Sequence, residues 1–573
     1  MHKILQAAIM AFSVAALVVP QAYGDEGSGH LNNRNGIRRV LLISIDGMHA
    51  LDYENCVNGG YCPQMAALGK HGVTYTRTST SKPSDSFPGL MALVTGATPK
   101  TVGAFYDVAY DRVLAPPTID TGNGVFGGTC KPGVANGTTT EFEEGVDFDQ
   151  TQLSGGGPYA NPIDGGIKSI NPLRLPRDPF SKPACQPVYP WQFIRTNSIY
   201  GVIHAAGGYT AWSDKHAVYA AVSGHGDTAN NVDDYYAPDV NSNVVGLPGV
   251  TTATGHSCAT PTGSGAWTDD FQDIQCNDAL KVNSILNEID GKTHLGDAKA
   301  PVPNLFGMNF QAVSVGQKLI EGGVYGGYMD AAGHPTPAMM NEILFADASI
   351  GQMVSELKNR NLLDSTLIII TAKHGQSPID TNRFQKIGKG ITTTPADVIA
   401  GFLPPVPAPE NPNTPNGIGP TQDDISLMWL APGANLTSAV SALEASGTAG
   451  IGLGQIFYGP SLETMFNAPG VPTYAGGTGG DPRTPDIIVQ PNVGVIYTGS
   501  KKKQAEHGGF ANDDTNVMML VSNPDFDAST VTSFVETTQV APTILKALGL
   551  DPNKLDGVQK EGTPVLPGLD FEN

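Results

Sequence analysis

The chain has 573 residues, enough for roughly two to four domains or for one large domain with long insertions. Its 33 Lys and Arg against 54 Asp and Glu give a formal net charge of −21, which repels nucleic acid and anionic membranes, so we expect stable binding to neither. Its 69 Gly and 44 Pro are about a fifth of the chain, a share that predicts long irregular loops around a regular core.

The first 24 residues have the features of an export signal. His2 and Lys3 form a short basic segment, residues 4–19 are almost uninterruptedly apolar, and residues 22–24 supply small side chains at the spacing of a cleavage site. The apolar run is slightly short for a membrane span, and no later stretch is long and apolar enough for one. We therefore predict a mature chain that is secreted or periplasmic and has no membrane span.

A buried strand is predicted at 39–45, where β-branched residues and leucine follow one another without alternation. It ends at Asp46, a position from which a side chain can face a ligand. Residues 87–95 predict a helix, because Pro88 suits a first helical turn. Residues 112–190 are rich in Gly, Pro and Asn and are interpreted as an insertion.

The middle of the chain predicts a helix at 191–206 and a short strand at 209–212, followed by a loop-rich stretch at 217–300. Lys215 and His216 come directly after that strand. They can line a cleft, but a structural pair is at least as good an interpretation. A second strand is predicted at 306–313.

The last third begins with the best helix of the sequence, at 336–357, whose apolar residues fall on one face. A buried strand at 366–371 follows and ends on Lys373-His374-Gly375. Residues 380–490 are interpreted as a further insertion. A strand at 517–521 and a helix at 538–548 complete the pattern, with Gly549 at the helix end.

The alternation of buried strands and amphipathic helices predicts an α/β fold with a largely parallel sheet. Ligands gather at the carboxyl ends of the strands in such sheets. The sequence also has six cysteines, and an even number in an exported chain favours disulfides. Fifteen pairings are open. Proximity in sequence favours Cys56–Cys62, Cys130–Cys185 and Cys258–Cys276, and without a CxxC pair we expect no cysteine zinc site.

Five segments combine carboxylates, imidazoles and one serine, the ligand types found in catalytic zinc sites. Each is weak by itself, because an Asp after a strand is often a turn residue and a His-Gly pair is common in loops. Taken by itself, Ser86 is interpreted as an ordinary helix N-cap. The segments are Ile45-Asp46-Gly47, Ser84-Asp85-Ser86-Phe87-Pro88-Gly89, Asp330-Ala331-Ala332-Gly333-His334, Lys373-His374-Gly375-Gln376 and Glu506-His507-Gly508-Gly509.

In this order the segments resemble the alkaline phosphatase superfamily, and most closely its type I phosphodiesterase / nucleotide pyrophosphatase branch. That branch has an Asp after the first strand, a Ser or Thr nucleophile before Phe-Pro, then Asp-x-x-x-His, Asp-His-Gly and a late His-Gly. The resemblance implies a three-layer α/β/α catalytic domain over residues 25–573, with insertions at about 112–190, 217–300 and 380–490. It covers roughly residues 38–111, 300–380 and 500–560.

The resemblance also implies one or two metal ions, with zinc expected and other divalent cations possible. Asp330, His334 and His507 match the ligands of one ion. Asp46, Ser86 and His374 match the ligands of the other. Two ions about 3.5–4 Å apart can bind the attacking and leaving oxygens of an in-line displacement. Ser86 would attack as an alkoxide, and the start of a helix would favour the incoming anion.

Two residues depart from the branch pattern. Lys373 stands where the branch has an Asp, and a protonated lysine cannot ligate a metal. Its ammonium can instead take over part of a metal's electrostatic role, or the side chain can point away. Asp107 stands where the branch has an Asn that binds a phosphate oxygen. It can accept from a substrate hydroxyl or pair with Lys373.

The sequence therefore predicts an exported phosphodiesterase or nucleotide pyrophosphatase that works through a phosphoryl-serine, with a small phosphate ester or nucleotide as its partner. One alternative is a phosphomonoester, phosphonate or sulfate ester hydrolase that uses one metal plus Lys373. The other is a non-catalytic exported binding protein on the same scaffold. Substrate specificity is expected to reside in the insertions.

Overall fold

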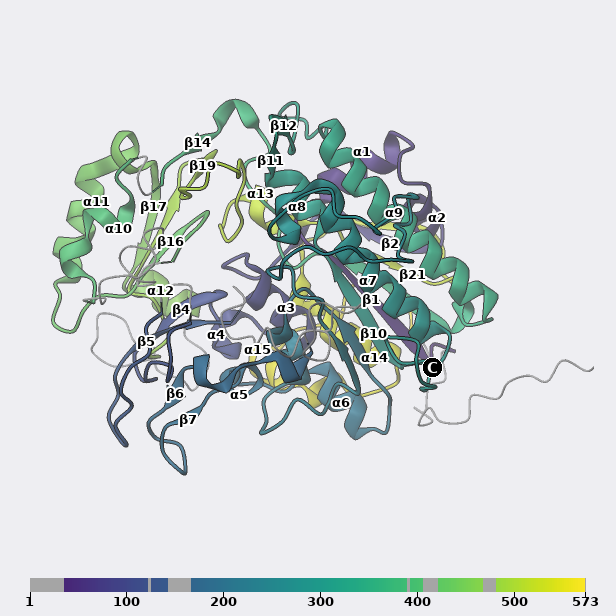
Figure 1. The fold of residues 1–573 in the computed structure, drawn as a ribbon, viewed down its shortest axis with the longest axis horizontal. Coiled ribbons are helices and arrows are strands. Elements are labelled where there is room, and N and C mark those ends of the chain that lie inside the picture. The colour runs from purple at the N-terminus through teal and green to yellow at the C-terminus, as the bar shows by residue number, and fades with distance from the viewer. Residues whose placement is uncertain are drawn as a thin grey trace, which may run out of the picture.

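The computed structural model describes residues 36–121, 125–142, 166–388, 392–404, 421–466 and 481–571 (Figure 1). The predicted export signal lies outside these residues. No helix in this part of the chain combines the length and the apolar character that a membrane crossing requires.

A sheet of eight strands forms the centre of the molecule, with the order β22-β2-β21-β13-β1-β10-β8-β9. The five strands from β13 to β9 are parallel, and β21 runs against both of its neighbours. The predicted α/β class with a largely parallel sheet is thus confirmed. The strands are β1 (Arg39–Ile45), β2 (Gly72–Tyr75), β8 (Ala211–Ser213), β9 (Asp234–Tyr236), β10 (Leu305–Phe310), β13 (Thr366–Thr371), β21 (Leu520–Ser522) and β22 (Ser529–Val531).

Both faces of this sheet are covered by helices, as Figure 1 shows on either side of β1 and β10. Successive side chains of a strand point to opposite faces. Accordingly Leu42 packs with the helices α3, α6 and α14, whereas Ile43 packs with α7, α8 and α9. This two-sided burial explains the uninterrupted apolar runs. The helices are α3 (Ser86–Thr95), α6 (Ile199–Ala205), α7 (Phe271–Ile289), α8 (Ala312–Lys318), α9 (Pro337–Asn359) and α14 (Val540–Ala547).

A second, four-stranded sheet stands to the left of the central one in Figure 1, with the order β15-β16-β18-β17. It packs against helix α11 and has its own apolar core, which includes Met428, Leu443 and Ile487. Its elements are β15 (Thr421–Gln422), β16 (Ser426–Met428), α11 (Leu436–Ile451), β17 (Leu453–Tyr458), α12 (Pro460–Phe466) and β18 (Ile487–Pro491).

Short elements make up most of the connections. They are α1 (Ala50–Asn58), α2 (Pro63–Gly69), β3 (Thr78–Ser79), α4 (Pro99–Val102), β4 (Val108–Asp111), β5 (Thr138–Glu141), β6 (Arg177–Asp178), β7 (Gln186–Pro187), α5 (Pro190–Phe193), η4 (Ala217–Ser223), β11 (Ile320–Glu321), β12 (Val324–Tyr325), β14 (Gln385–Lys386), α10 (Pro395–Val398), β19 (Val495–Ile496), α13 (Asn512–Thr515), β20 (Asn516–Val517), β23 (Val535–Glu536) and α15 (Asp556–Glu561).

Four stretches differ from the sequence prediction, and one of them is the strand expected at 517–521, which is divided between β20 and β21 in two different sheets. The helix expected at 191–206 is two helices, because Ser198 starts α6 as a new N-cap. The strand expected at 306–313 ends at Phe310 and α8 follows. The stretch 217–300 is not loop throughout, since it contains β9 and the 19-residue α7. Buried polar residues such as Asp278 and Lys281 interrupt the apolar periodicity of α7, so the sequence does not indicate this helix.

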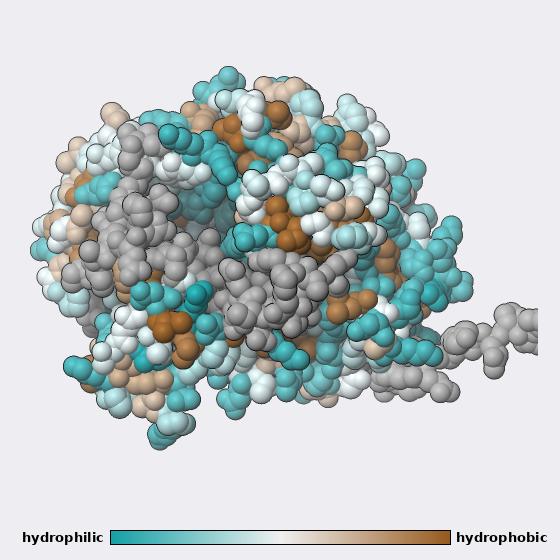
Figure 2. All heavy atoms as spheres, in the orientation of Figure 1, coloured by the Kyte–Doolittle hydropathy of each residue, from teal (hydrophilic) through white to brown (hydrophobic). Residues whose placement is uncertain are grey.

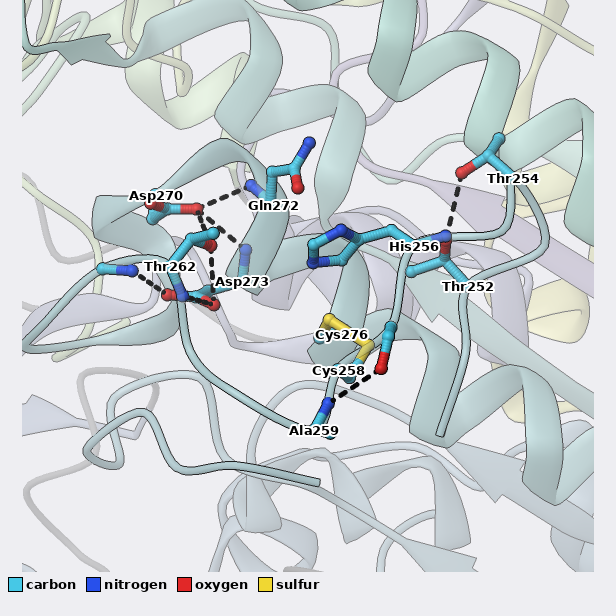
Figure 3. Close-up of a disulfide and its surroundings, with 12 residues drawn as sticks. Thr252, Thr254, His256, Cys258, Ala259, Thr262, Asp270, Gln272, Asp273 and Cys276 are labelled. Atoms are coloured by element: carbon cyan, nitrogen blue, oxygen red, sulfur yellow. Dashed lines mark hydrogen bonds between the residues drawn. A yellow bond between two sulfur atoms is a disulfide. The ribbon is translucent and has the colours of Figure 1, made fainter. Parts of the chain in front are cut away.

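All three favoured disulfides are present: Cys56–Cys62, Cys130–Cys185 and Cys258–Cys276. Figure 3 shows that the last one fastens the loop before α7 to the helix itself. Asp270 caps α7 by accepting from the amides of Gln272 and Asp273, and Thr262 donates to Asp270. These bonds give an irregular loop a fixed position against the central domain.

Candidate active site

Four neighbouring parallel strands end at the same edge of the central sheet. Asp46 follows β1, and Lys373 and His374 follow β13. On the other side of β1, Asn309 lies near the end of β10, and Lys215 follows β8. The carboxyl edge of the sheet thus carries two ammonium groups, a carboxylate and an imidazole, at the place where ligands bind in this type of fold.

Ser86 reaches this edge at the start of α3 and is completely buried. The helix can approach the sheet closely because residue 89 is a glycine. A Cβ on Gly89 would stand 2.2 Å from the carbonyl oxygen of Lys373. The first turn of α3 therefore lies directly on the end of β13.

The hydroxyl of Ser86 lies between a donor and an acceptor. Lys215 Nζ donates to Ser86 Oγ at 2.9 Å, and His374 Nε2 lies 3.1 Å from the same oxygen. His374 Nδ1 is 2.8 Å from the carbonyl oxygen of Gly375, so Nδ1 is the donating nitrogen. In the neutral ring the lone pair of Nε2 therefore faces the serine hydroxyl.

Asp46 is the carboxylate of this cluster. Its Oδ2 accepts from Asn309 Nδ2 at 3.0 Å and lies 3.4 Å from Lys215 Nζ and 4.0 Å from Lys373 Nζ. Burial alone would raise the pKa of Asp46, but Lys373, Lys215 and His374 outweigh burial and hold that pKa well below its ordinary value. Asp46 is consequently ionised at neutral pH.

Lys373 points into the protein and pairs with Asp214. Its Nζ lies 2.9 and 3.1 Å from the two carboxylate oxygens of Asp214, and 4.0 Å from the centre of the Tyr219 ring. Asp214 also accepts from Trp212 Nε1 at 2.9 Å and from the Lys215 amide at 2.8 Å. The side chain of Lys373 is thus fixed by an ion pair and by a cation–π contact.

His507 and Asp107 complete the surroundings of the serine. The centre of the His507 ring lies 4.0 Å from that of His374, with the two rings tilted by 32°, and His507 Nδ1 lies 3.3 Å from Asp85 Oδ1. Burial, His374 and nearby lysines hold the pKa of His507 well below its ordinary value, so its ring is neutral at pH 7. Asp107 is buried and its amide donates to Asp85 Oδ2 at 2.8 Å.

A cavity of about 220 Å³ lies beside this cluster. Lys215 connects the two, because it contacts Ser86 and also lines the cavity. In Figure 2 hydrophilic residues surround a hollow between the second sheet and α8. The charged and imidazole side chains that line the cavity are Asp107, Lys215, His216, Asp269, Lys318, Asp423, Lys502, Lys503 and His507.

Asp330 and His334 do not join this cluster. They pair with each other at 2.8 Å on the loop before α9, with side chains 49% and 57% exposed. Asn55 of α1 holds that loop through the carbonyls of residues 332 and 333. His334 lines a different cavity, beside α1. In the chain this loop follows α8 and the β11–β12 hairpin.

A sequence model of the type I phosphodiesterase / nucleotide pyrophosphatase family matches residues 40–133 and 249–397. These stretches contain Asp46, Ser86 and His374. In both stretches the chain is similar to this family, which indicates a phosphoric ester hydrolase of the phosphodiesterase type. No curated protein sequence matches the chain.

Solved structures agree with this family on the fold. Murine ectonucleotide pyrophosphatase / phosphodiesterase 5 is similar over 90% of this chain and 96% of its own, with 15% identity and a TM-score of 0.51. The inactive variant of that murine protein in complex with AMP gives the same values. The chain thus has the alkaline phosphatase-like arrangement that the resemblance implies.

The residues present do not fit the two-ion centre of the family pattern. Lys215 Nζ lies 2.9 Å from Ser86 Oγ and 3.4 Å from Asp46 Oδ2, so an ammonium stands beside two of the three donors expected for one ion. The donors expected for the other ion are split between two cavities. Within the ranges that the structure describes, no group of three or more His, Cys, Asp or Glu is arranged to hold a metal.

Asp214 and Lys215 carry no catalytic prediction from the sequence. The sequence feature that could have identified them is their position, because they follow the short strand β8 just as Asp46 follows β1. β8 has only three residues, and its motif matches none of the family segments. Sequence motifs therefore do not identify Asp214, and the sequence indicates Lys215 only as a residue that can line a cleft, although the parallel strand order brings Lys215 to the serine.

Proposed function

We propose that this protein hydrolyses phosphodiesters by nucleophilic attack of Ser86, with nucleotides or their esters as substrates. The observation that supports this most directly is the position of the serine hydroxyl between Lys215 Nζ and His374 Nε2. A serine needs such a neighbouring acceptor in order to lose its proton as it attacks.

In the first step Ser86 Oγ attacks phosphorus and its proton passes to His374 Nε2. A bond forms between Oγ and phosphorus as the bond to the leaving oxygen breaks. The leaving oxygen then takes the proton from His374. The product of this step is a phosphoryl-serine that keeps the remaining ester group, together with a free alcohol or phosphate.

In the second step water replaces the serine. His374 Nε2 takes a proton from the water as its oxygen bonds to phosphorus and the bond to Ser86 Oγ breaks. The same proton returns to the serine oxygen. The enzyme is restored, and the second product is a phosphomonoester.

The cavity indicates where the rest of the substrate binds. Lys318, Lys502 and Lys503 line it away from the serine and favour a substrate with further negative charge, such as a nucleotide. The AMP complex of the murine relative is consistent with that class of ligand. Asp107 lines the same cavity, and we propose that it accepts a hydrogen bond from a substrate hydroxyl.

The zinc ions expected from the resemblance take no part in the proposed steps, because the expected metal ligands do not lie together around one position. Asp330 and His334 are left out of the proposed site for the same reason. Asp46 and His507 stay in it as neighbours that fix the charge and the position of His374. Export is proposed as well, since three disulfides are typical of oxidising compartments.

The test is turnover of nitrophenyl diester, monoester and sulfate substrates by the wild type and by Ser86→Ala. We expect the diester to be preferred and Ser86→Ala to lose about a thousandfold or more in kcat. Ser81→Ala is a matched control, because this serine is buried on the same loop and its hydroxyl has no partner among the described residues. Turnover that survives in Ser86→Ala contradicts the assigned nucleophile.

A further inference from the structure

We infer that Lys215, supported by Lys373, supplies at Ser86 the positive charge that a divalent ion supplies in the family pattern, so that the serine reacts without a metal bound to it. This inference rests on the proposed serine mechanism. It assigns a catalytic role to Lys215, which touches the reacting oxygen, and a positioning role to Lys373.

Lys215 stands where an ion would bind. Ser86 Oγ, Asp46 Oδ2 and His374 Nε2 are the three donors expected for one ion, and His374 Nε2 lies 3.1 and 3.7 Å from the other two. The position at which one ion would contact all three atoms is adjacent to Lys215 Nζ. This nitrogen lies 2.9 Å from Ser86 Oγ and 3.4 Å from Asp46 Oδ2. An ammonium has no lone pair for a metal and repels a cation at that distance.

The charges of the site balance without a metal ion. In the family pattern one divalent ion faces two carboxylates, the Asp after the first strand and the Asp before His-Gly. Here two ammonium groups, Lys215 and Lys373, face two carboxylates, Asp46 and Asp214. The formal charge of the site is the same in both cases. The change from Asp to Lys at 373 is thus compensated by an Asp at 214.

The two lysine side chains are held in fixed positions. Lys373 is fully buried and Lys215 is 4% exposed. Lys373 is held by Asp214 and by the Tyr219 ring, and Asp214 accepts from the backbone amide of Lys215. Asp214 therefore orients both lysines. A donor that is already in place stabilises charge on Ser86 Oγ without rearrangement.

During the reaction Lys215 keeps its proton. Its hydrogen bond to Ser86 Oγ strengthens as negative charge grows on that oxygen, and it lines the cavity through which a phosphate oxygen arrives. The serine proton goes to His374, as proposed above. No bond to Lys215 or Lys373 forms or breaks.

The first experiment measures turnover of a nitrophenyl diester before and after removal of metals by a chelator, with metal content determined on the same samples. We expect the wild type to keep its rate within about twofold and Lys215→Met to lose about 10² to 10³ in kcat with little change in KM. Lys215→Arg should recover part of the rate. Lys501→Met, an exposed lysine outside the cavity, serves as the control.

The second experiment measures zinc binding by titration calorimetry and does not depend on turnover. The wild type should bind no zinc through His374, whereas Lys215→Ala/Lys373→Asp, which restores the family carboxylate and removes the ammonium, should bind about one ion per chain. A circular dichroism spectrum like that of the wild type shows that the double variant folds. Zinc uptake by the wild type that disappears in His374→Ala overturns the inference.

The outcomes separate this inference from the proposed function. Turnover that needs Ser86 but is lost on chelation and restored by zinc contradicts the role of the lysines and leaves the serine mechanism in place. Turnover that does not need Ser86 contradicts the mechanism itself. If no ester is turned over, the zinc titration still decides whether the lysines occupy the metal position.

Discussion

The ammonium of Lys215 donates a hydrogen bond to the hydroxyl of Ser86 across 2.9 Å, although 129 positions separate the two residues in the chain. The contact exists because β8 and β13 both belong to the parallel part of the central sheet, and α3, which begins at Ser86, lies against the end of β13. It places a fixed positive charge on the proposed nucleophile.

The exposed pair Asp330 and His334 should contribute little to catalysis. The double variant Asp330→Asn/His334→Ala should keep diester turnover within about twofold, because His334 lines a different cavity from His507 and Asp330 pairs with His334, and exposed ion pairs contribute little to stability. His507→Ala is the comparison and should lower kcat. A loss in the double variant as large as that in His507→Ala would show that the loop reaches the serine during turnover.

Asp214 should be important for stability as well as for the site. Asp214→Asn leaves the buried ammonium of Lys373 without its carboxylate, which we expect to cost about 3–5 kcal/mol in the free energy of unfolding. Urea denaturation measures this cost, and the exposed Asp227→Asn provides the control. Asp214→Asn/Lys373→Met should recover part of the loss, since it removes the unpaired charge. A cost below about 1 kcal/mol in Asp214→Asn would mean that Lys373 finds another partner.

Gly89→Ala should disturb the serine without touching its hydrogen bonds. The new methyl group would meet the Lys373 carbonyl oxygen at 2.2 Å, so the first turn of α3 must move away from β13. We expect a loss of about 1–3 kcal/mol in stability and up to about a hundredfold in kcat. Gly401→Ala, whose surroundings are open, should change neither quantity. Unaltered turnover in Gly89→Ala would show that the position of α3 is not critical.

Asp514 should make the protein less stable as the pH rises toward neutrality. Burial raises the pKa of Asp514 to about 7, and burial followed by Asp514 raises the pKa of Asp424 well above its ordinary value. The two carboxyls face the same point, since a Cβ on Gly509 would lie 2.0 and 2.2 Å from one oxygen of each. The folded protein therefore holds a proton that the unfolded chain releases above about pH 4.

The sign of the pH effect follows from that proton. The contribution of Asp514 is present in full below about pH 4 and is lost as the pH rises to about 7, with a slope of at most about 1.4 kcal/mol per pH unit. Urea denaturation from pH 5 to 8 should show a steeper decline in the wild type than in Asp514→Asn, which is always neutral. Parallel pH profiles for the two proteins would indicate that Asp514 is ionised throughout.

The sequence by itself determined the two central strands β1 and β13 and the resemblance to the family. β1 and β13 are recognisable because strands buried on both faces have uninterrupted apolar side chains, and the residues after them, Asp46 and His374, are local parts of the motif. Ser86 is recognisable because it starts a helix before Phe-Pro. Patterns of this kind depend on nearest neighbours in the chain, so they can be found without tertiary information.

The tertiary structure alone decided which of these residues meet. Lys215 and Asp214 follow a three-residue strand whose place in the sheet is set by its pairing with β10, and no periodicity in the sequence encodes that pairing. Asp330 and His334 match a motif, but in the folded chain they form an exposed pair, and His334 lines a different cavity from His507. The physical reason is the same in both cases. Local propensity determines where elements begin and end, whereas strand order and connections, which depend on packing across hundreds of residues, determine what lies beside the serine.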